Sequence, residues 1–170
     1  GDGTFIEAAR TFLDSRAPAI NQPLLVDIGN TSLLDLVGTS DQGFQLLTAS
    51  TTRLTILNSL RIPGSLRGPT VPADLDGDGD TDLIVASSPP RVLWNSKGLL
   101  VDASRLNAMP DLDNSWLGRP VIADFNGDGR NDILASSGQI WVQGDTQLYR
   151  SNTGLPLQSA FTQAHPIDLN

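Results

Sequence analysis

An all-β fold built from repeated four-stranded units is predicted for this chain from three observations. Two acidic stretches, residues 74–82 and 124–132, share one pattern 50 positions apart. Short apolar runs of four to six residues surround them, separated by the Ser-Gly, Gly-Asp and Asn-Gly pairs that hairpin turns require. Glycine (16) and proline (11) are too frequent for a helical solenoid. An array of such units at 44–50 residues per unit is typical of a β-propeller of four-stranded antiparallel blades.

Composition narrows the possible functions of the chain. Its 170 residues, 39% of them hydrophobic, suffice for one ordinary domain with a core. Eleven basic against nineteen acidic residues give a net charge of −8, so a nucleic-acid partner is not expected. The absence of cysteine excludes disulfides, thiolate zinc sites and cysteine nucleophiles. No apolar run approaches the roughly 20 residues of a membrane helix, and the first residues do not resemble a signal peptide.

The first whole unit is predicted over residues 21–66. Its segment LLVDIGNTSLLDLVGTS keeps Asp27 and Asp35 eight positions apart, as the two acidic stretches do with their first and last aspartates. Gly29 and Thr31 stand where the second unit has carboxylates. We therefore expect a degenerate blade here, with the same loop but without a bound ion.

The second and third units are predicted over residues 67–116 and 117–163, and each contains one acidic stretch. Their apolar runs are only four to six residues long and have a strand-like periodicity, which favours strands. The expected strands are 70–74, 82–87 and 91–95 in the second unit, and 120–124, 132–137, 139–143 and 146–150 in the third.

The two ends of the chain look like parts of further units. Residues 1–20 read as the tail of a preceding blade, although residues 4–17 are also the best helical candidate in the sequence. Residues 164–170 read as the start of a further blade, with Asp168 standing 44 positions after Asp124. Closed propellers have about four to eight blades. Further blades, from the same or another chain, are therefore expected.

The acidic stretch DLDGDGDTD places five aspartates at every second position from Asp74 to Asp82. Like charges so close together repel unless something positive lies among them. In the pattern D-x-D-x-D-G-x-x-D, the first, third and fifth side chains can turn toward one point. The sixth residue is glycine because the backbone there takes a positive φ. The seventh offers a carbonyl and the ninth a further carboxylate, and such an oxygen set suits Ca²⁺ better than Mg²⁺.

An EF-hand is the alternative that the start of this pattern suggests. That motif needs an acidic residue at its twelfth position, where this chain has Val85 in one stretch and Ala135 in the other. Helices should also flank it, whereas a β-rich apolar run follows each stretch at once. The EF-hand interpretation is therefore rejected.

The nine-residue loop running into a strand resembles the FG-GAP/VCBS family of propeller repeats, which includes the calcium-binding blades of integrin α subunits. DLDGDGDTD fits that family's pattern in full, DFNGDGRND fits it with asparagine at the third position, and the opening GDGTF is similar to the tail of its repeat. The resemblance implies two Ca²⁺ ions, one in each loop. The implied ligands are Asp74, Asp76, Asp78, the Asp80 carbonyl and Asp82 in the first loop, and Asp124, Asn126, Asp128, the Arg130 carbonyl and Asp132 in the second.

Aromatic residues offer weaker functional candidates. Trp94 and Trp141 follow apolar residues at comparable places in their units, so we expect them to pack between sheets rather than to form a sugar-binding platform. Trp116 lies with Asp111 and Asp113 in the longer connection between the second and third units. Such connections often carry function, so these three residues are candidates for ligand contact.

No arrangement of catalytic residues is visible in the sequence. His165 is the only histidine and precedes Pro166 near the end of the chain, which favours a surface or packing role. We therefore expect no enzyme activity in this segment. The predicted function is a rigid, calcium-stabilised scaffold for binding a protein or glycan in an extracellular, cell-surface or periplasmic setting. The alternative is an ancillary propeller portion of a larger secreted enzyme, such as a polysaccharide lyase.

Overall fold

The computed structural model describes residues 19–41, 43–50, 54–56, 68–103, 118–144 and 148–150. This part of the chain consists of antiparallel strands joined by loops and turns, without an α-helix. The prediction of an all-β fold is confirmed. The helical candidate 4–17, the partial units at both ends, Trp116 with its two aspartates, and His165 lie outside the described residues.

The strands form three sheets of four strands, and in each sheet the strands follow one another in chain order. Such meanders need only hairpin connections, in agreement with the turn residues between the apolar runs. The first sheet contains β1 (Asn21–Val26), β2 (Asp35–Ser40), β3 (Gly43–Ala49) and β4 (Leu54–Ile56). The second contains β5 (Thr70–Ala73), β6 (Asp82–Val85), β7 (Arg91–Ser96) and β8 (Leu99–Asp102). The third contains β9 (Val121–Ala123), β10 (Asp132–Leu134), β11 (Ile140–Gln143) and β12 (Leu148–Arg150).

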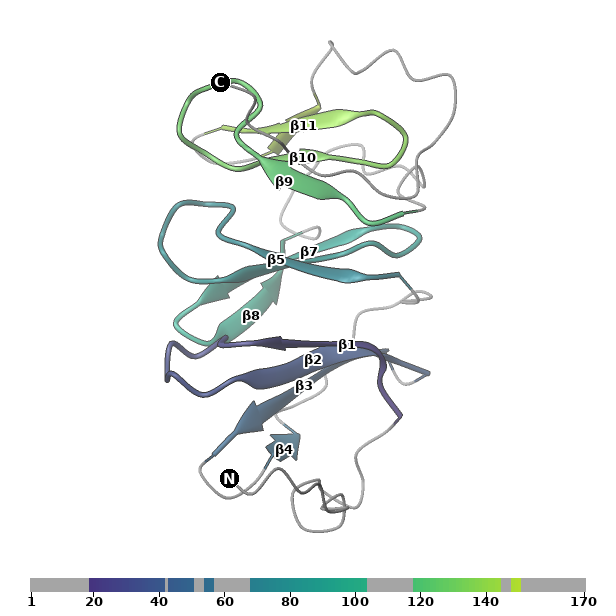
Figure 1. Ribbon diagram of the computed structural model, residues 1–170, viewed down its shortest axis with the longest axis vertical. Coiled ribbons are helices and arrows are strands. Elements are labelled where there is room, and N and C mark those ends of the chain that lie inside the picture. The colour runs from purple at the N-terminus through teal and green to yellow at the C-terminus, as the bar shows by residue number, and fades with distance from the viewer. Residues whose placement is uncertain are drawn as a thin grey trace, which may run out of the picture.

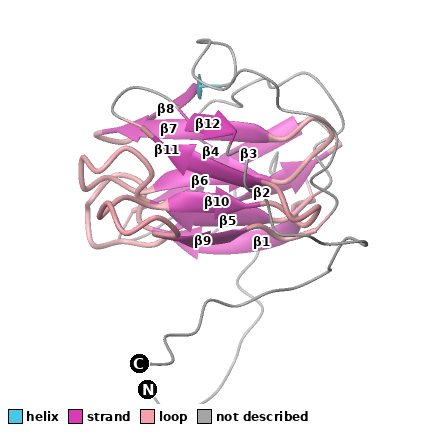
Figure 2. Ribbon diagram, turned by 90° about the horizontal axis from the view of Figure 1, so that it is seen from above, coloured by secondary structure: helices cyan, strands magenta, loops and turns pink. Residues whose placement is uncertain are grey.

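The three sheets stack face to face in chain order (Figure 1). Seen from above, the first strands β1, β5 and β9 run along one edge of the stack (Figure 2). The β1–β2, β5–β6 and β9–β10 loops all lie on the same side of the stack, at the left in Figure 1. Loops that are one repeat apart in the sequence therefore become neighbours in space.

Apolar side chains fill both spaces between the sheets. Leu83 of β6 and Leu93 of β7 face the first sheet, where they join a cluster with Val37 and Phe44. Ile84, the next residue of β6, faces the third sheet. A strand that is buried on both faces is apolar at successive positions rather than alternating. This explains why the run Leu-Ile-Val follows Asp82 without a polar interruption.

Trp94 and Trp141 pack in the space between the second and third sheets, as predicted, and Trp141 is fully buried. The two positions are not equivalent, however. The backbone N–H of Asn95 donates to Asp82, and that of Gln143 donates to Asp132, so Asn95 and Gln143 are the matching residues. The two tryptophans are thus one residue out of register, and they enter the same space from opposite sheets. Counting from apolar neighbours missed this shift because strand faces alternate with each residue.

Candidate metal loops

Three nine-residue loops occupy the same place in the three sheets, each between the first and second strands. They are residues 27–35, 74–82 and 124–132, and each ends on the first residue of the second strand. Their first residue is an aspartate in every case. The loops therefore compare position by position, with or without acidic residues inside them.

The first aspartate folds each acidic loop around its own carboxylate. The two oxygens of Asp74 accept hydrogen bonds from the backbone N–H groups of Gly77 (2.8 Å) and Gly79 (3.1 Å). Both glycines have positive φ, +78° and +88°, which side chains disfavour. The predicted role of the sixth loop residue is confirmed, and the fourth has the same backbone requirement. The alternation D-G-D-G in the sequence is the signal for it.

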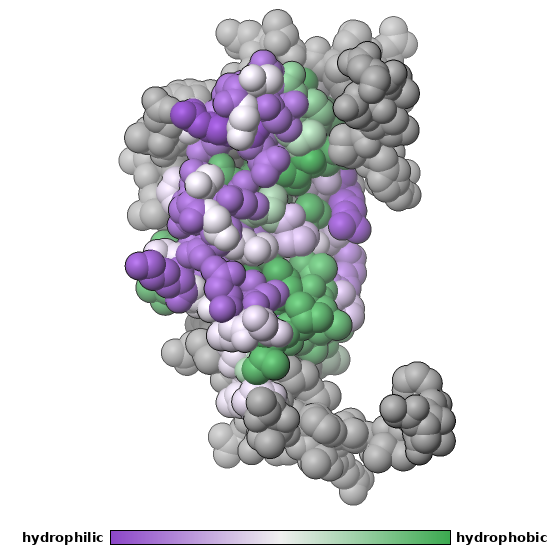
Figure 3. Space-filling view, turned by 60° about the vertical axis from the view of Figure 1, so that its left-hand side comes forward, coloured by the Kyte–Doolittle hydropathy of each residue, from purple (hydrophilic) through white to green (hydrophobic). Residues whose placement is uncertain are grey.

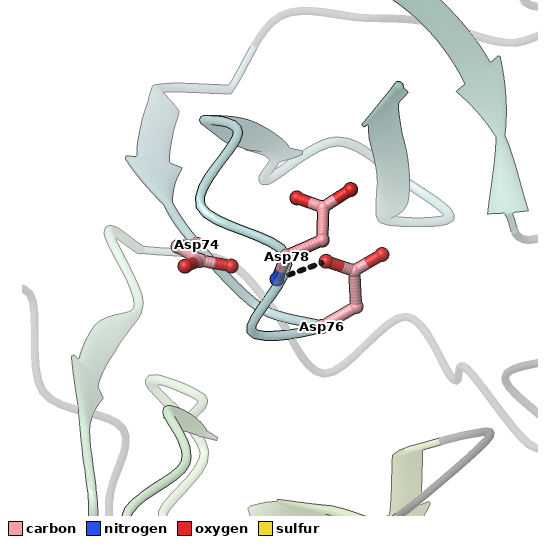
Figure 4. Close-up of side chains that lie close together, drawn as sticks. All are labelled: Asp74, Asp76 and Asp78. Atoms are coloured by element: carbon pink, nitrogen blue, oxygen red, sulfur yellow. Dashed lines mark hydrogen bonds between the residues drawn. The ribbon is translucent and has the colours of Figure 1, made fainter. Parts of the chain in front are cut away.

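Three carboxylates meet in the 74–82 loop. One oxygen from each of Asp74, Asp76 and Asp78 lies within 4.8 Å of the other two. All three side chains come from a single turn, in which Asp76 accepts the backbone N–H of Asp78 at 3.2 Å (Figure 4). Burial raises the pKa of Asp76, the Asp78 N–H bond lowers it, and the charges of Asp78 and Asp74 raise it further. Clustered carboxylates that hinder one another's ionisation fit a hard cation.

The 124–132 loop repeats this backbone arrangement with one carboxylate replaced by an amide. Asp124 accepts backbone N–H bonds from Gly127 (2.7 Å) and Gly129 (2.8 Å), and these glycines also have positive φ. The bond from Gly129 is the largest of several that lower the pKa of Asp124. Asn126 donates its side-chain amide to Asp128 at 3.0 Å. The amide removes one like charge and still provides an oxygen that could bind a cation.

The ninth loop residue is a buried aspartate in all three sheets, namely Asp35, Asp82 and Asp132. In the second sheet, Asp82 accepts the backbone N–H of Leu75 in its own loop and that of Asn95 in β7, both at 2.7 Å. This carboxylate therefore ties the loop to the third strand of the sheet. The corresponding donors are Ile28 (3.0 Å) and Ala49 (2.8 Å) for Asp35, and Phe125 (3.0 Å) and Gln143 (2.9 Å) for Asp132.

The buried position of Asp82 disfavours the charged form of its carboxylate. Burial raises its pKa to about 6, although the N–H bonds from Asn95 and Leu75 lower it. The negative charges of Asp76 and Asp78 also raise the pKa of Asp82, because they repel its carboxylate. A cation among those carboxylates would relieve this repulsion.

The 27–35 loop keeps the same path without internal carboxylates. Asp27 accepts the backbone N–H groups of Thr31 (2.9 Å) and Ser32 (2.6 Å). Asn30 and Ser32 have φ of +52° and +65°, and they stand where the acidic loops have their two glycines. The loop thus keeps its first and ninth aspartates as hydrogen-bond acceptors, and it forms without the carboxylates that the acidic loops have between these two positions.

The seventh loop residue uses its side chain outside the loop. The carboxylate of Asp80 accepts the side-chain amide of Asn30 from the first sheet and the backbone N–H of Lys97 in the β7–β8 turn. The sequence singled out Asp80 for its carbonyl and gave no sign of this contact. Its partners come from a different unit and a different hairpin, so only the packing of the sheets reveals it.

The side of the stack that carries the loops is largely hydrophilic (purple in Figure 3), with hydrophobic residues (green) gathered beside it in the lower half of the view. Partly exposed large apolar residues include Leu25, Leu99 and Phe125. Within the described ranges, no helix is both long and apolar enough to cross a membrane.

Comparison with known families identifies one segment of the chain. Residues 74–135 match the family model described as FG-GAP-like repeat. The match begins at the first residue of one acidic loop and ends just after β10, so it spans both acidic loops and the strands between them. No curated protein matches the chain. The resemblance that the loop pattern predicts is confirmed over these residues.

Proposed function

We propose that this chain, in which residues 74–135 are FG-GAP-like repeat sequence, is part of a calcium-stabilised β-propeller that presents a rigid surface to a protein or glycan ligand. The observation that carries the proposal is the meeting of the Asp74, Asp76 and Asp78 carboxylates within 4.8 Å, in a loop whose counterpart recurs in the next sheet. Repeats of this type are typical of extracellular domains. The repeat type and the proposed calcium loops both favour an extracellular or periplasmic location for the protein, where calcium is plentiful.

Each Ca²⁺ would be held by one acidic loop and would supply the positive charge that the clustered aspartates need. In the first loop the ligands are Asp74, Asp76, Asp78, the carbonyl of Asp80 and Asp82. In the second they are Asp124, Asn126, Asp128, the carbonyl of Arg130 and Asp132. Asp82 and Asp132 already accept two backbone N–H bonds each, and a carboxylate has about four lone-pair sites, so ligation can add to these bonds.

The burial of the second loop residue supports continuation of the stack into a propeller. Ile28 and Leu75 are each only 1% exposed, because the next sheet along the chain covers them. Phe125 is the matching residue of the third sheet and is 39% exposed. A further sheet of the same kind would cover it. The first strands already share one edge of the stack, as strands around a central axis would (Figure 2).

The proposed role is binding rather than catalysis. The FG-GAP-like repeat is a non-catalytic repeat type, and the carboxylates of the acidic loops are engaged in shaping the loops themselves. The second candidate is an ancillary portion of a larger secreted enzyme, whose catalytic residues would lie in other parts of that protein. Fold alone does not separate the two.

Calorimetric titration with Ca²⁺ tests the metal proposal. We expect two sites in the unaltered chain and one in the double variant Asp76→Ala/Asp78→Ala, which removes both side-chain oxygens and keeps Asp74 and Asp82 to shape the loop. Asp41→Asn, an exposed substitution just after β2, is the control and should keep both sites. Two sites in the double variant, or no heat in the unaltered chain, would overturn the proposal.

Pull-down from an extracellular extract and a glycan array, each with Ca²⁺ and with a chelator, test the scaffold role. Ligand capture that requires Ca²⁺ and is lost in the double variant is the expected result. Hydrolysis or elimination of an array glycan by the chain would instead favour an enzyme and contradict the binding role.

A further inference from the structure

Asparagine side chains from both neighbouring sheets donate hydrogen bonds to the 74–82 loop. From the first sheet, the Asn30 amide nitrogen donates to Oδ1 of Asp80 at 2.5 Å. From the third sheet, the Asn131 amide nitrogen donates to the backbone carbonyl of Asp74 at 2.9 Å. These contacts join residues 50 and 57 positions apart in the chain. Both therefore exist only once the sheets have stacked.

A third asparagine links the same loops from inside. Asn95 of β7 is 1% exposed, and its amide nitrogen donates to the carbonyl of Ile28 (2.8 Å) and to that of Thr81 (3.1 Å). Its amide oxygen accepts the backbone N–H of Gly98 at 2.9 Å. The 27–35 loop, the 74–82 loop and the β7–β8 turn thus share one buried hydrogen-bonding group. Buried amides with several partners hold backbone segments in one arrangement.

We infer that Asn30 and Asn131 are positioning residues for the 74–82 metal loop, so that this loop reaches its full cation affinity only when both neighbouring loops are in place. The inference rests on the proposed calcium function and adds its regulation. Asn131 fixes the backbone of the first loop residue, Asp74, whose carboxylate belongs to the triad. Asn30 fixes the side chain of Asp80, the seventh residue, whose carbonyl is a proposed ligand.

The physical basis is the cost of ordering a loop around an ion. A loop whose ends and turns are already held loses less conformational freedom when the ion binds, which increases affinity. The 27–35 loop lacks internal carboxylates and yet supplies one of the two hydrogen bonds, the one from Asn30. Its role in the stack is then to support the metal loop beside it, and this explains why its shape is retained.

The Asn131 contact also couples the two metal loops. Asn131 is the eighth residue of the 124–132 loop, so an ion that orders this loop also orders the amide that holds Asp74. Linkage requires the effect to be reciprocal, with each ion favouring the other. Calcium binding to the two loops is therefore positively cooperative.

Two substitutions remove the hydrogen bonds of Asn30 and Asn131 without straining the backbone, because each introduces a residue that another repeat has at the same position. Asn30→Gly introduces the residue that both acidic loops have at the matching position, where φ is positive. Asn131→Thr introduces the residue that the 74–82 loop has at its own eighth position. Ser32→Gly is the matched control, because it also places glycine at a positive-φ position of the 27–35 loop and leaves the Asn30 contact intact.

The amide resonances of Gly77 and Gly79 report the 74–82 loop during a Ca²⁺ titration by NMR, and those of Gly127 and Gly129 report the other loop. We expect Asn30→Gly and Asn131→Thr each to weaken Ca²⁺ binding at the 74–82 loop about threefold to tenfold, the range of one net hydrogen bond. Ser32→Gly should leave it unchanged. Equal affinities in all four proteins would overturn the inference while leaving the calcium proposal intact. If the unaltered chain shows no calcium-dependent shift, the calcium proposal itself fails.

A double-mutant cycle tests the coupling. Asp128→Asn replaces a proposed ligand and should weaken Ca²⁺ binding at the 124–132 loop. In the otherwise unaltered chain it should also weaken Ca²⁺ binding at the 74–82 loop. In the Asn131→Thr background the same substitution should have no further effect on that loop. An equal effect of Asp128→Asn in both backgrounds would show that Asn131 carries no coupling.

Discussion

At the scale of single residues, the ninth loop aspartate explains how the repeat holds its shape. Asp35, Asp82 and Asp132 are all buried, and each accepts one backbone N–H from its loop and one from the third strand. The repeated spacing identified these residues from the sequence. Their bonds to the third strand could not be predicted, because that strand lies 11–14 positions further along the chain.

Asp35 separates this structural role from metal binding, since its loop lacks internal carboxylates. Asp35→Ala would leave the backbone N–H groups of Ile28 and Ala49 without a charged acceptor in a buried position. We expect it to lower the free energy of unfolding by about 2–4 kcal/mol, from one to two unsatisfied donors. Denaturation by urea without calcium measures this, with Asp41→Ala as the exposed control. A loss of unfolding free energy no larger than that of Asp41→Ala would contradict the structural role of Asp35.

The raised pKa of Asp82 makes a prediction about pH. Between about 4 and 6 the folded chain holds a proton on Asp82 that the unfolded chain, with an ordinary pKa of 3.8, has released. The folded state therefore binds more protons in this window, and stability should fall as the pH rises through it. Metal-free protein should accordingly unfold at lower urea concentration at pH 7 than at pH 5. Stability that instead increases from pH 5 to pH 7 would contradict the assignment.

At the scale of strands and sheets, the acidic loops and the short strands after them were predictable, whereas the facing of side chains was only partly so. Apolar runs marked β6 and β10 because both faces of these strands are buried. The one-residue shift between Trp94 and Trp141 was not predictable, since it depends on which residue of β7 or β11 bonds to the ninth loop aspartate.

Trp141 tests how far the sheets depend on their mutual packing. It is fully buried between the second and third sheets, whereas Trp94 is only partly buried against the same cluster. Trp141→Ala should cost about 3–5 kcal/mol of stability, the usual range for a large buried aromatic side chain. Trp94→Ala should cost less, because less of its surface is removed from solvent. Equal losses in thermal or urea unfolding would contradict the packing described here.

At the largest scale, the three sheets of the described residues stack so that their loops form one row linked by asparagine side chains. The repeat spacing predicted the sheets, and the acidic pattern predicted the triad of Asp74, Asp76 and Asp78. The links between loops were hidden from the sequence, because Asn30, Asn95 and Asn131 occupy different positions in their repeats. Contacts between repeats depend on stacking geometry rather than on any one repeat.

Calcium should stabilise the stack as a unit. At a hundredfold excess of Ca²⁺ over its dissociation constant, each site adds about 2.7 kcal/mol to the free energy of unfolding. For a chain of this size that corresponds to a rise in Tm of roughly 5–10 °C per site. Calorimetry with Ca²⁺ and with EGTA measures the shift, and limited proteolysis should cut the 74–82 loop faster in EGTA. A Tm that EGTA leaves unchanged would count against both sites.

A crystal structure of the chain grown with CaCl₂, with anomalous diffraction recorded to locate calcium, would show whether the acidic loops bind the ion. We expect one anomalous peak among Asp74, Asp76 and Asp78, a second among Asp124, Asn126 and Asp128, and none in the 27–35 loop. Acidic loops without an anomalous peak at millimolar Ca²⁺ would show that they are not calcium sites.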